Sequence, residues 1–586
     1  MPVLENYEPR AVLRFFEEIC SIPHGSGNTG KISDYLVRFA RERQLDFRKE
    51  NCNNVIIRKP ASPGYEYAPT VILQGHMDMV TVKTGDCLKD LSREGLDLQV
   101  VQMPGANPTE PADTWWLTAK GTSLGGDDGI AVAYALAILD DDNIPHPPLE
   151  AVFTVDEEVG MLGATALDAS DLKGRILLNI DSEDEGIFTV SCAGGLTAVA
   201  KVPCQREVES GTLLSLRLDG FTGGHSGVEI GEGRLNAILT AGRLLHMLKE
   251  PDLRLVSMTG GEKDNAIAAF CDIQLLLPET DKALPADGVR SPAQDLRKMS
   301  ESVLETKDDA CTGNSLAECG DECIQNPAVG MTFPAQDPWK ILEAVPETSD
   351  DTCTESSLSE CDDTSSRHPA PADRVRRLEE KIRQEIARLC RIYRGKDDAI
   401  QVSLQAEQAA SVSCMTAKST AQLLQMLMNL PNGIQRMSPD VEGLPQTSLN
   451  LGILRTEEAG VRLHCSLRSA VEEEKYFLLE RLRSYLGLFG GTVMVEGDYP
   501  GWAYRPLSRL RDVMTEVYLQ QYGREPVVEG IHAGLECGIF CAKLPGLDCI
   551  SFGPQINEIH TTREALSLAS VERTWRLLLE TLARLK

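Results

Sequence analysis

Three apolar segments that each lead into acidic or histidine side chains constrain the fold of this chain most. The segments and the groups that follow them are 70–75 with His76 and Asp78, 149–155 with Glu157 and Glu158, and 175–180 with Asp181. Short apolar runs of this kind predict buried strands. In an open α/β sheet the ligand site lies beyond the carboxyl ends of the strands. We therefore expect an α/β fold in which these side chains line one edge of a mostly parallel sheet.

A glycine-rich turn followed by an alanine-rich run adds one more acidic group. Residues 121–140 read GTSLGGDDGIAVAYALAILD, which predicts a buried helix with Asp127 and Asp128 at its N-cap and first turn. The helix dipole favours anions there, so the two acids could simply cap the helix. The glycine spacing matches neither a phosphate-binding loop nor a dinucleotide fingerprint. The neighbouring strand ends favour a functional role, with Asp127 beside them.

The order of predicted elements suggests two domains. From about residue 191 the pattern changes to strands, a glycine-rich loop with His225 and a helix, and the last part of the chain resumes the first pattern. We expect a catalytic domain built from residues 1–195 and 491–586, with the second part completing its sheet. An α+β lid domain at 196–490 is expected to interrupt it.

Residues 292–375 contain a tandem duplication at a constant offset of 42, in which PAQDLRK recurs as PAQDPWK. This segment carries 18 Asp and Glu against 6 Lys and Arg, with few aromatic residues. That composition is typical of disorder. We therefore predict a disordered acidic insertion in the lid domain, dispensable for folding and turnover.

The charge of the 586-residue chain excludes several partners. A formal net charge of −30 argues against a nucleic-acid partner and against an anionic membrane surface. The sequence has no apolar run long enough to span a membrane and no signal-peptide pattern at its start. The 17 cysteines, an odd number, are interpreted as reduced thiols, which predicts a cytoplasmic protein.

The predicted cluster combines one or two histidines with three or four carboxylates. Such a donor set suits zinc, manganese or cobalt, often as a pair held by a bridging carboxylate that activates one water for hydrolysis. His76 is interpreted as a ligand, with Asp78 behind it to orient the imidazole. Of the adjacent Glu157 and Glu158, one can bind metal while the other moves protons.

Several motifs in fixed order resemble the M20 metallopeptidases. They are GHMDMV, LGGDDGI, TVDEEVGMLGA, NIDSEDEG and GGHSG, and IHAGLECG, SFGPQINEIHTTRE and YPGW resemble the Xaa-His dipeptidase branch, also called aminoacyl-histidine dipeptidases. Together they span nearly the whole chain except residues 292–375. The resemblance implies a di-metal aminopeptidase-like catalytic domain that hydrolyses Xaa-His dipeptides such as beta-alanyl-histidine, and other dipeptides. It also implies a homodimer formed through the lid domain.

The resemblance implies a role for each matching residue. The metal ligands would be His76, Asp127, Glu158, Asp181 and His560, with Asp127 bridging two divalent ions. Zinc is the expected ion, with manganese or cobalt as alternatives. Glu157 would be the general base and Asp78 would orient His76. Many family members have Ala-Asp-Asn where this chain has Gly126, Asp127 and Asp128, a departure that we expect activity to survive.

Four further residues are implied in substrate binding. His225 in the lid would polarise the scissile carbonyl and stabilise the oxyanion, reaching into a partner subunit's site. Asn265 matches a substrate-contacting asparagine. His532 and Glu536 would line the substrate pocket or support the residues that do. Two alternatives stay open: an N-acyl amino acid deacylase or carboxypeptidase on the same scaffold, or an inactive scaffold that acts through its acidic repeat.

Overall fold

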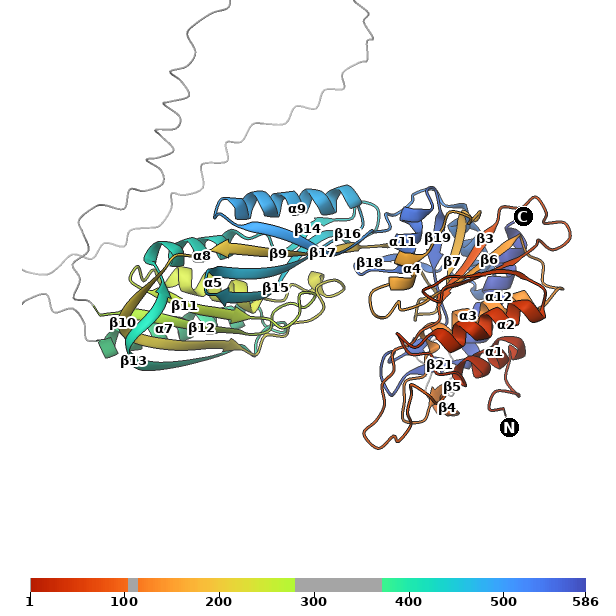
Figure 1. The fold of residues 1–586 in the computed structure, drawn as a ribbon, viewed down its shortest axis with the longest axis horizontal. Coiled ribbons are helices and arrows are strands. Elements are labelled where there is room, and N and C mark those ends of the chain that lie inside the picture. Colours follow the sequence, from red (N-terminus) through yellow and green to blue (C-terminus); the bar gives the residue numbers. More distant parts are fainter. Residues whose placement is uncertain (1, 104–113, 280–370) are drawn as a thin grey trace, which may run out of the picture. The chain divides into compact units, whose positions relative to one another are not determined.

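An eight-stranded sheet brings the predicted strand ends together (Figure 1). The computed structural model describes residues 2–103, 114–279 and 371–586. The strand order is β1 (Asp46–Lys49), β2 (Val55–Lys59), β6 (Leu149–Thr154), β3 (Val71–His76), β7 (Ile176–Asn179), β19 (Asp548–Ser551), β8 (Ile187–Cys192) and β18 (Val527–Ile531). Strand β3 runs parallel to both β6 and β7, with Gln74 opposite Val152 and Asn179. The carboxyl ends of these three strands therefore lie at one edge, which confirms the predicted α/β arrangement.

The eight-stranded sheet is mixed rather than uniformly parallel. Strands β7 and β19 and strands β8 and β18 also pair in parallel, whereas β1–β2, β2–β6 and β8–β19 are antiparallel. The C-terminal part of the chain supplies β18 and β19, so it completes this sheet as predicted.

Apolar side chains cover both faces of the sheet, as expected for strands with near-continuous apolar runs. Val71 and Leu73 of β3 face a core built with five helices, and the intervening Ile72 faces the opposite core. The five helices are α1 (Arg10–Cys20), α2 (Gly30–Glu42), α3 (Gly126–Asp140), α10 (Arg509–Tyr522) and α12 (Leu568–Arg584). The opposite core includes residues of α4 (Leu162–Ala166) and α11 (Glu536–Lys543). Helix α3 is buried almost all round, which confirms the predicted buried helix.

A small four-stranded sheet includes two strands from the region between Val80 and Thr118, for which the sequence pattern predicts no strand. Its strand order is β20 (Ile556–Asn557), β21 (Ala565–Ser567), β5 (Thr114–Ala119) and β4 (Leu98–Met103). Strand β4 is mostly half-exposed, so its burial lacks a strong alternation that a sequence pattern could reveal. Because β21 pairs with β5, the C-terminal turn between β20 and β21 is anchored to this part of the chain.

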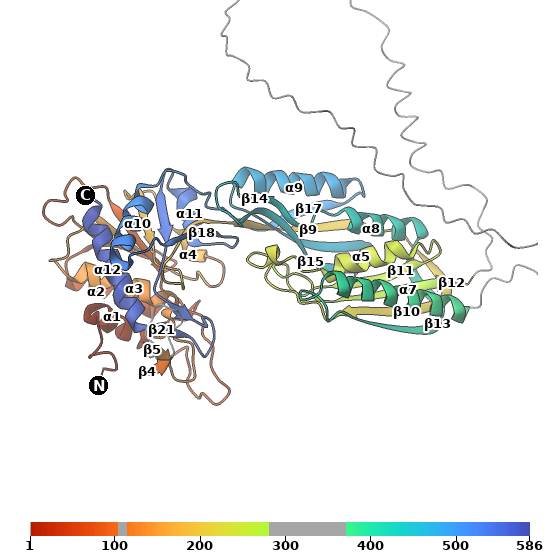
Figure 2. The ribbon, with the colours of Figure 1, turned by 180° about the vertical axis from the view of Figure 1, so that it is seen from behind.

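The second large sheet has nine strands, all paired antiparallel. The order is β13 (Gln401–Met415), β10 (Arg206–Asp219), β12 (Cys271–Pro278), β11 (Arg254–Gly260), β15 (Pro445–Glu457), β16 (Gly460–Ser469), β9 (Gly194–Pro203) and β17 (Thr492–Tyr499), with β14 (Gly433–Met437) beside β15. Helices α5 (Ala237–Leu248), α7 (Pro371–Ile392), α8 (Ala417–Asn429) and α9 (Glu472–Gly487) share its core (Figure 2). A short 3-10 helix, η1 (Ile230–Glu232), follows the loop that carries His225.

The division into domains stays a prediction. By their contacts, the described residues belong to a single unit, Met1–Glu279 with Ala370–Lys586. The chain passes from one large sheet to the other between β8 and β9, and it leaves the nine-stranded sheet after β17.

The predicted insertion is corrected at one end. Residues 371–375 belong to α7, whose helix begins before the predicted end of the insertion. The remainder, 292–370, lies outside the described residues. Among the described helices, none combines the length and the apolar character that a membrane crossing needs.

Candidate metal centre

Two groups of potential metal ligands share Asp127. One group is His76, Asp127 and Asp181, and the other is Asp127, Glu158 and His560. Within each group the donor atoms lie within 4.8 Å of one another. Asp127 Oδ1 lies 3.0 Å from His76 Nε2, and Asp127 Oδ2 lies 3.1 Å from His560 Nε2. Because each carboxylate oxygen faces a different imidazole, Asp127 has the geometry of a bridging ligand.

His76 is oriented from behind by Asp78. Its Nδ1 lies 2.9 Å from the backbone carbonyl oxygen of Asp78 and 3.6 Å from the Asp78 carboxylate. The bond to the carbonyl places the ring proton on Nδ1 and leaves Nε2 free to face the centre. The buried carboxylate instead accepts hydrogen bonds from Ser26 Oγ at 2.8 Å and from the backbone N–H of Glu157 at 3.1 Å. Asp78 thus contacts both a candidate ligand and the candidate base.

Asp127 lies at the irregular start of α3. Its backbone and that of Asp128 are not helical, and Gly125 just before them has a φ of 68°. Asp128 is buried and belongs to neither ligand group, and its Oδ2 accepts the backbone N–H of His76 at 3.1 Å. The structure therefore gives Asp128 a contact of its own, apart from the ligand groups that share Asp127.

Glu564 holds the loop before Asp127, and sequence reasoning missed it. Its carboxylate is buried and accepts the backbone N–H groups of Leu124, Gly125 and Gly126 at 2.8, 3.2 and 2.7 Å. Its sequence signals are its place four residues after His560 and at the end of the motif SFGPQINEIHTTRE, and neither predicts where its side chain points.

The crowded carboxylates perturb one another and the two histidines. Burial and the neighbouring Asp181, Glu536 and Glu158 raise the pKa of Glu157 to about 9. Hydrogen bonds to Asp127 and Glu158 raise the pKa of His560 to about 10. Divalent cations would relieve this clustering, because they favour ionised carboxylates and neutral imidazoles. The donor set, two imidazoles and several carboxylates with one shared, fits a pair of zinc-like ions.

His225 and Asn265 lie side by side in the loops of the nine-stranded sheet. His225 forms an isolated β-bridge with Ala266, and the backbone N–H of Ser226 donates to the carbonyl oxygen of Asn265 at 2.9 Å. The backbone N–H groups of Gly227 and Val228 both point at His225 Nδ1, each at 3.3 Å. Since Nδ1 accepts, the neutral ring carries its proton on Nε2.

Arg468 of β16 faces His225 and was also missed from the sequence. One guanidinium nitrogen lies 3.5 Å from His225 Nε2, and another donates to the Tyr499 hydroxyl at 3.2 Å. Arg468 is only 6% exposed, and no carboxylate of the described residues lies within ion-pair distance of it. Burial and the charge of Arg468 lower the pKa of His225. The guanidinium of Arg468, which can only donate, therefore lies beside Nε2 of His225.

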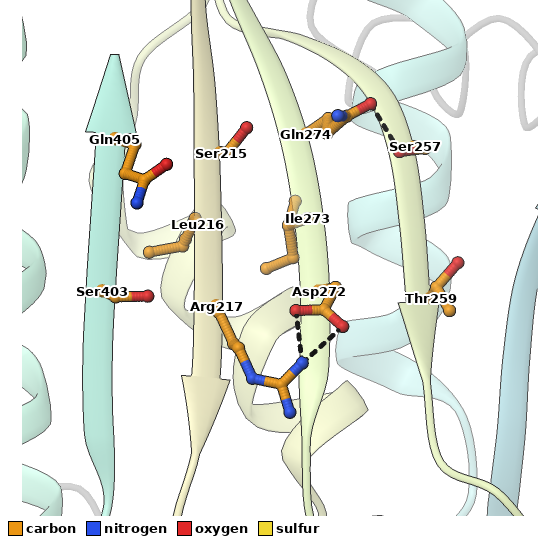
Figure 3. Close-up of a pocket in the computed structure, with 10 residues that line it drawn as sticks. All are labelled: Ser215, Leu216, Arg217, Ser257, Thr259, Asp272, Ile273, Gln274, Ser403 and Gln405. Carbon is orange, nitrogen blue, oxygen red and sulfur yellow. Dashed lines mark hydrogen bonds and ion pairs between the residues drawn. The ribbon is translucent and has the colours of Figure 1, made fainter.

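A second arginine shows the contrasting case. Arg217 lines a cavity of about 440 Å³ on strands β10–β13 and donates to both oxygens of Asp272, at 3.0 and 2.8 Å. Figure 3 shows this pair among the residues that line the cavity. Its charge is already paired, and the cavity is lined by none of the predicted site residues. This cavity is therefore a poor candidate for the reaction site.

His532 and Glu536 are both buried. His532 Nε2 lies 2.7 Å from Ser448 Oγ, and burial with the charge of Arg468 lowers its pKa to about 4. Glu536 Oε2 accepts from Gln74 Nε2 at 2.5 Å and from Thr154 Oγ1 at 2.7 Å, at the carboxyl ends of β3 and β6. These contacts favour support of the strand ends over direct substrate contact for Glu536.

Comparisons with known proteins decide the family. Residues 72–584 match the model of peptidase family M20/M25/M40. The chain belongs to this peptidase family. It is 30% identical over 589 residues to the cytosol non-specific dipeptidase of Escherichia coli (strain K12), covering 99% of each chain. The crystal structure of the aminoacylhistidine dipeptidase from Vibrio alginolyticus is similar with a TM-score of 0.73 and 30% identity, over 99% of this chain and 97% of that one. This M20/M25/M40 member therefore has the α/β fold and family predicted from its motifs.

Proposed function

We propose that this M20/M25/M40 family member is a dipeptidase that uses two divalent metal ions, with zinc as the expected pair and manganese or cobalt as alternatives. One observation carries the proposal: the two oxygens of Asp127 face His76 and His560, each within a separate group of ligands. Glu157 belongs to neither group that shares Asp127, although it forms a third possible ligand group with His76 and Glu158. A carboxylate outside both ligand groups remains free to move protons.

The residues of the centre divide the work of hydrolysis. When bound, the ion pair would polarise the scissile carbonyl and lower the pKa of the attacking water. Glu157 accepts the proton from that water and passes it to the leaving amine. The Asp78 carboxylate keeps Glu157 in place by accepting the backbone N–H of Glu157. The backbone carbonyl of Asp78 binds Nδ1 of His76 and so keeps the Nε2 atom turned toward the ligand group.

The facing donors of His225 and Arg468 support an anionic or carbonyl-bearing substrate. Nε2–H of His225 can donate to the oxygen of the scissile peptide bond as negative charge develops there. Arg468, buried without a carboxylate partner, suits the C-terminal carboxylate of a short peptide. Asn265, adjacent to this pair, is proposed to contact the substrate.

The substrate class follows from the relatives together with this pair. The E. coli relative is named a non-specific dipeptidase and the Vibrio structure is an aminoacylhistidine dipeptidase. We propose Xaa-His dipeptides such as beta-alanyl-histidine, together with other dipeptides, as the substrates here. The name of the E. coli relative also supports a cytoplasmic location. A homodimer through residues 196–490 rests on the family resemblance.

The test is metal analysis of purified protein joined to a substrate panel. The panel contains Xaa-His dipeptides, other dipeptides, tripeptides and N-acetyl amino acids. We expect two ions per chain, dipeptide hydrolysis that chelation abolishes, and recovery with zinc, manganese or cobalt. Preferred turnover of N-acetyl amino acids would point to a deacylase, and full activity after the metal is removed would refute the two-metal mechanism.

A further inference from the structure

One side chain, Glu564, connects the turn that carries His560 to the backbone of the loop before Asp127. Glu564 comes from the turn between β20 and β21, and its carboxylate accepts three consecutive backbone N–H groups of the loop, from residues 440 to 438 positions away in the sequence. The last of these donors, Gly126, directly precedes Asp127. We propose that Glu564 is a positioning residue that sets the separation between Asp127 and His560, and thereby the affinity of the centre for its metal ions.

The environment of Glu564 supports a positioning role over a simple loop contact. The side chain is 3% exposed, so its carboxylate relies on these three donors for its solvation. A Cβ at Gly126 would lie only 3.3 Å from Glu564 Oε1 and 3.5 Å from Ile556, so glycine lets the carboxylate approach this closely. Three donors converge on one carboxylate, which restricts rotation of the loop relative to the turn.

His560 is the ligand that most needs such support. Its backbone has a φ of 60°, in the left-handed region, and its side chain is 43% exposed. It lies in a short turn in which the Thr561 hydroxyl donates to the Glu558 carbonyl oxygen at 2.8 Å. Without Glu564, the turn would keep its pairing with β5 through β21 and the contact of His560 with the Asp127 carboxylate, but it would lose its hydrogen bonds to the backbone of the loop before Asp127.

The chain offers a matched control in Glu150. Its carboxylate is 2% exposed and likewise accepts loop N–H groups, from Lys173 at 3.0 Å and Gly174 at 2.9 Å. Glu150 lies near the amino end of β6, four positions before Thr154, whereas the centre lies at the carboxyl end. Loss of either carboxylate should reduce stability, but only loss of Glu564 should change metal binding.

The experiment compares Glu564→Gln with Glu150→Gln in the full chain by thermal unfolding and by zinc titration of metal-free protein. Gln keeps the size but turns an amide N–H₂ toward the backbone donors. We expect Glu564→Gln to bind at least one of the two ions about 10- to 100-fold more weakly, the usual effect of losing a partner behind the ligands. Glu150→Gln should show a lower melting temperature with unchanged zinc affinity.

If Glu564→Gln does not fold, Glu564→Asp applies the same test, since its shorter side chain keeps the charge but withdraws the carboxylate from the three backbone donors. Wild-type zinc affinity in a folded Glu564→Gln, or in Glu564→Asp when the first variant does not fold, would overturn this inference. The inference rests on the proposed two-metal function. Failure of the wild-type protein to bind two ions would count against that function, whereas normal binding by wild type and both variants would count only against the role of Glu564.

Discussion

Asp78 Oδ1 accepts the backbone N–H of Glu157 at 3.1 Å, and the same oxygen lies 3.6 Å from His76 Nδ1. One buried carboxylate therefore contacts the segment after β6 and the end of β3. This relationship couples the position of the candidate base to that of a candidate ligand. Asp78 contacts Glu157 through the backbone N–H, so this contact does not occupy the Glu157 carboxylate.

The first prediction separates the adjacent glutamates. Glu157→Gln keeps the size of the side chain but removes its basic site, so turnover should fall by about 10²- to 10⁴-fold while both metals and dipeptide still bind. Glu158→Gln should instead weaken metal binding, because Glu158 lies 2.9 Å from His560 Nε2 in a ligand group. Steady-state kinetics and metal stoichiometry measure the two effects. The opposite pattern would exchange the two roles, and normal turnover in Glu157→Gln would refute this mechanism.

The second prediction concerns pH. In the metal-free protein, Asp127 and Glu158 raise the pKa of His560 to about 10, above the ordinary value of about 6.5. Protonated His560 thus stabilises the metal-free fold fully below the ordinary value, and this contribution is lost as the pH rises through about 10. A metal ion competes with that proton, so zinc affinity should rise with pH and binding should release protons. Calorimetry in buffers of different ionisation enthalpy measures the release.

The matching control for the pH experiment is His560→Gln. This variant should release fewer protons for each ion bound, and its metal-free form should lose less stability between neutral pH and pH 10 than the wild-type protein. Equal proton release by both proteins would show that His560 does not exchange its proton for metal.

The third prediction concerns substrate anchoring by Arg468. Arg468→Met removes the buried, carboxylate-free charge, so KM for dipeptides should rise by about 10- to 100-fold, the range for a hydrogen bond to a charged group. Metal stoichiometry should stay at the wild-type value. Arg217→Met is the control, because Arg217 is already paired with Asp272 and no predicted site residue lines the cavity in which it lies. An unchanged KM in Arg468→Met would exclude this anchoring role.

The fourth prediction concerns the acidic segment. Removing 292–370 should leave melting temperature and turnover close to those of the full chain. Extending the deletion to residue 375 removes the first turn of α7, where Val375 packs against the core of the nine-stranded sheet. The longer deletion should therefore melt at a lower temperature than the shorter one. A collapsed melting transition in the shorter deletion would show that the segment is needed for folding.

Much of the candidate metal centre was predictable because the potential ligands directly follow the predicted strands in the sequence. Apolar runs ending in His76, Glu158 and Asp181 predicted parallel strands whose carboxyl ends meet, and the sheet has that arrangement. The alanine-rich run after Asp127 predicted the buried helix beside them. These features are apolar runs and the polar residues at which the runs end, and both can be read directly from the sequence.

The residues that sequence reasoning missed act through contacts between distant segments. Arg468 looks like any strand arginine until β16 places it against His225, 243 positions away. Glu564 looks like an acid in a polar turn until β21 pairs with β5 and aims it at the Asp127 loop. Strands β4 and β5 were missed for a related reason, since pairing with β21 rather than burial pattern makes them a sheet.

The sequence by itself determined which chemical groups this protein gathers and at which edge of which sheet they gather. The spacing of apolar residues and the residues that end a strand are properties of short segments, so they can be read without knowing which segments pack against them. Only the tertiary structure decided that each oxygen of Asp127 faces a different histidine, that Asp128 accepts the backbone N–H of His76, and that Glu564 holds the loop before Asp127. Side-chain direction depends on backbone angles and on donors brought from hundreds of residues away, and no local pattern encodes these.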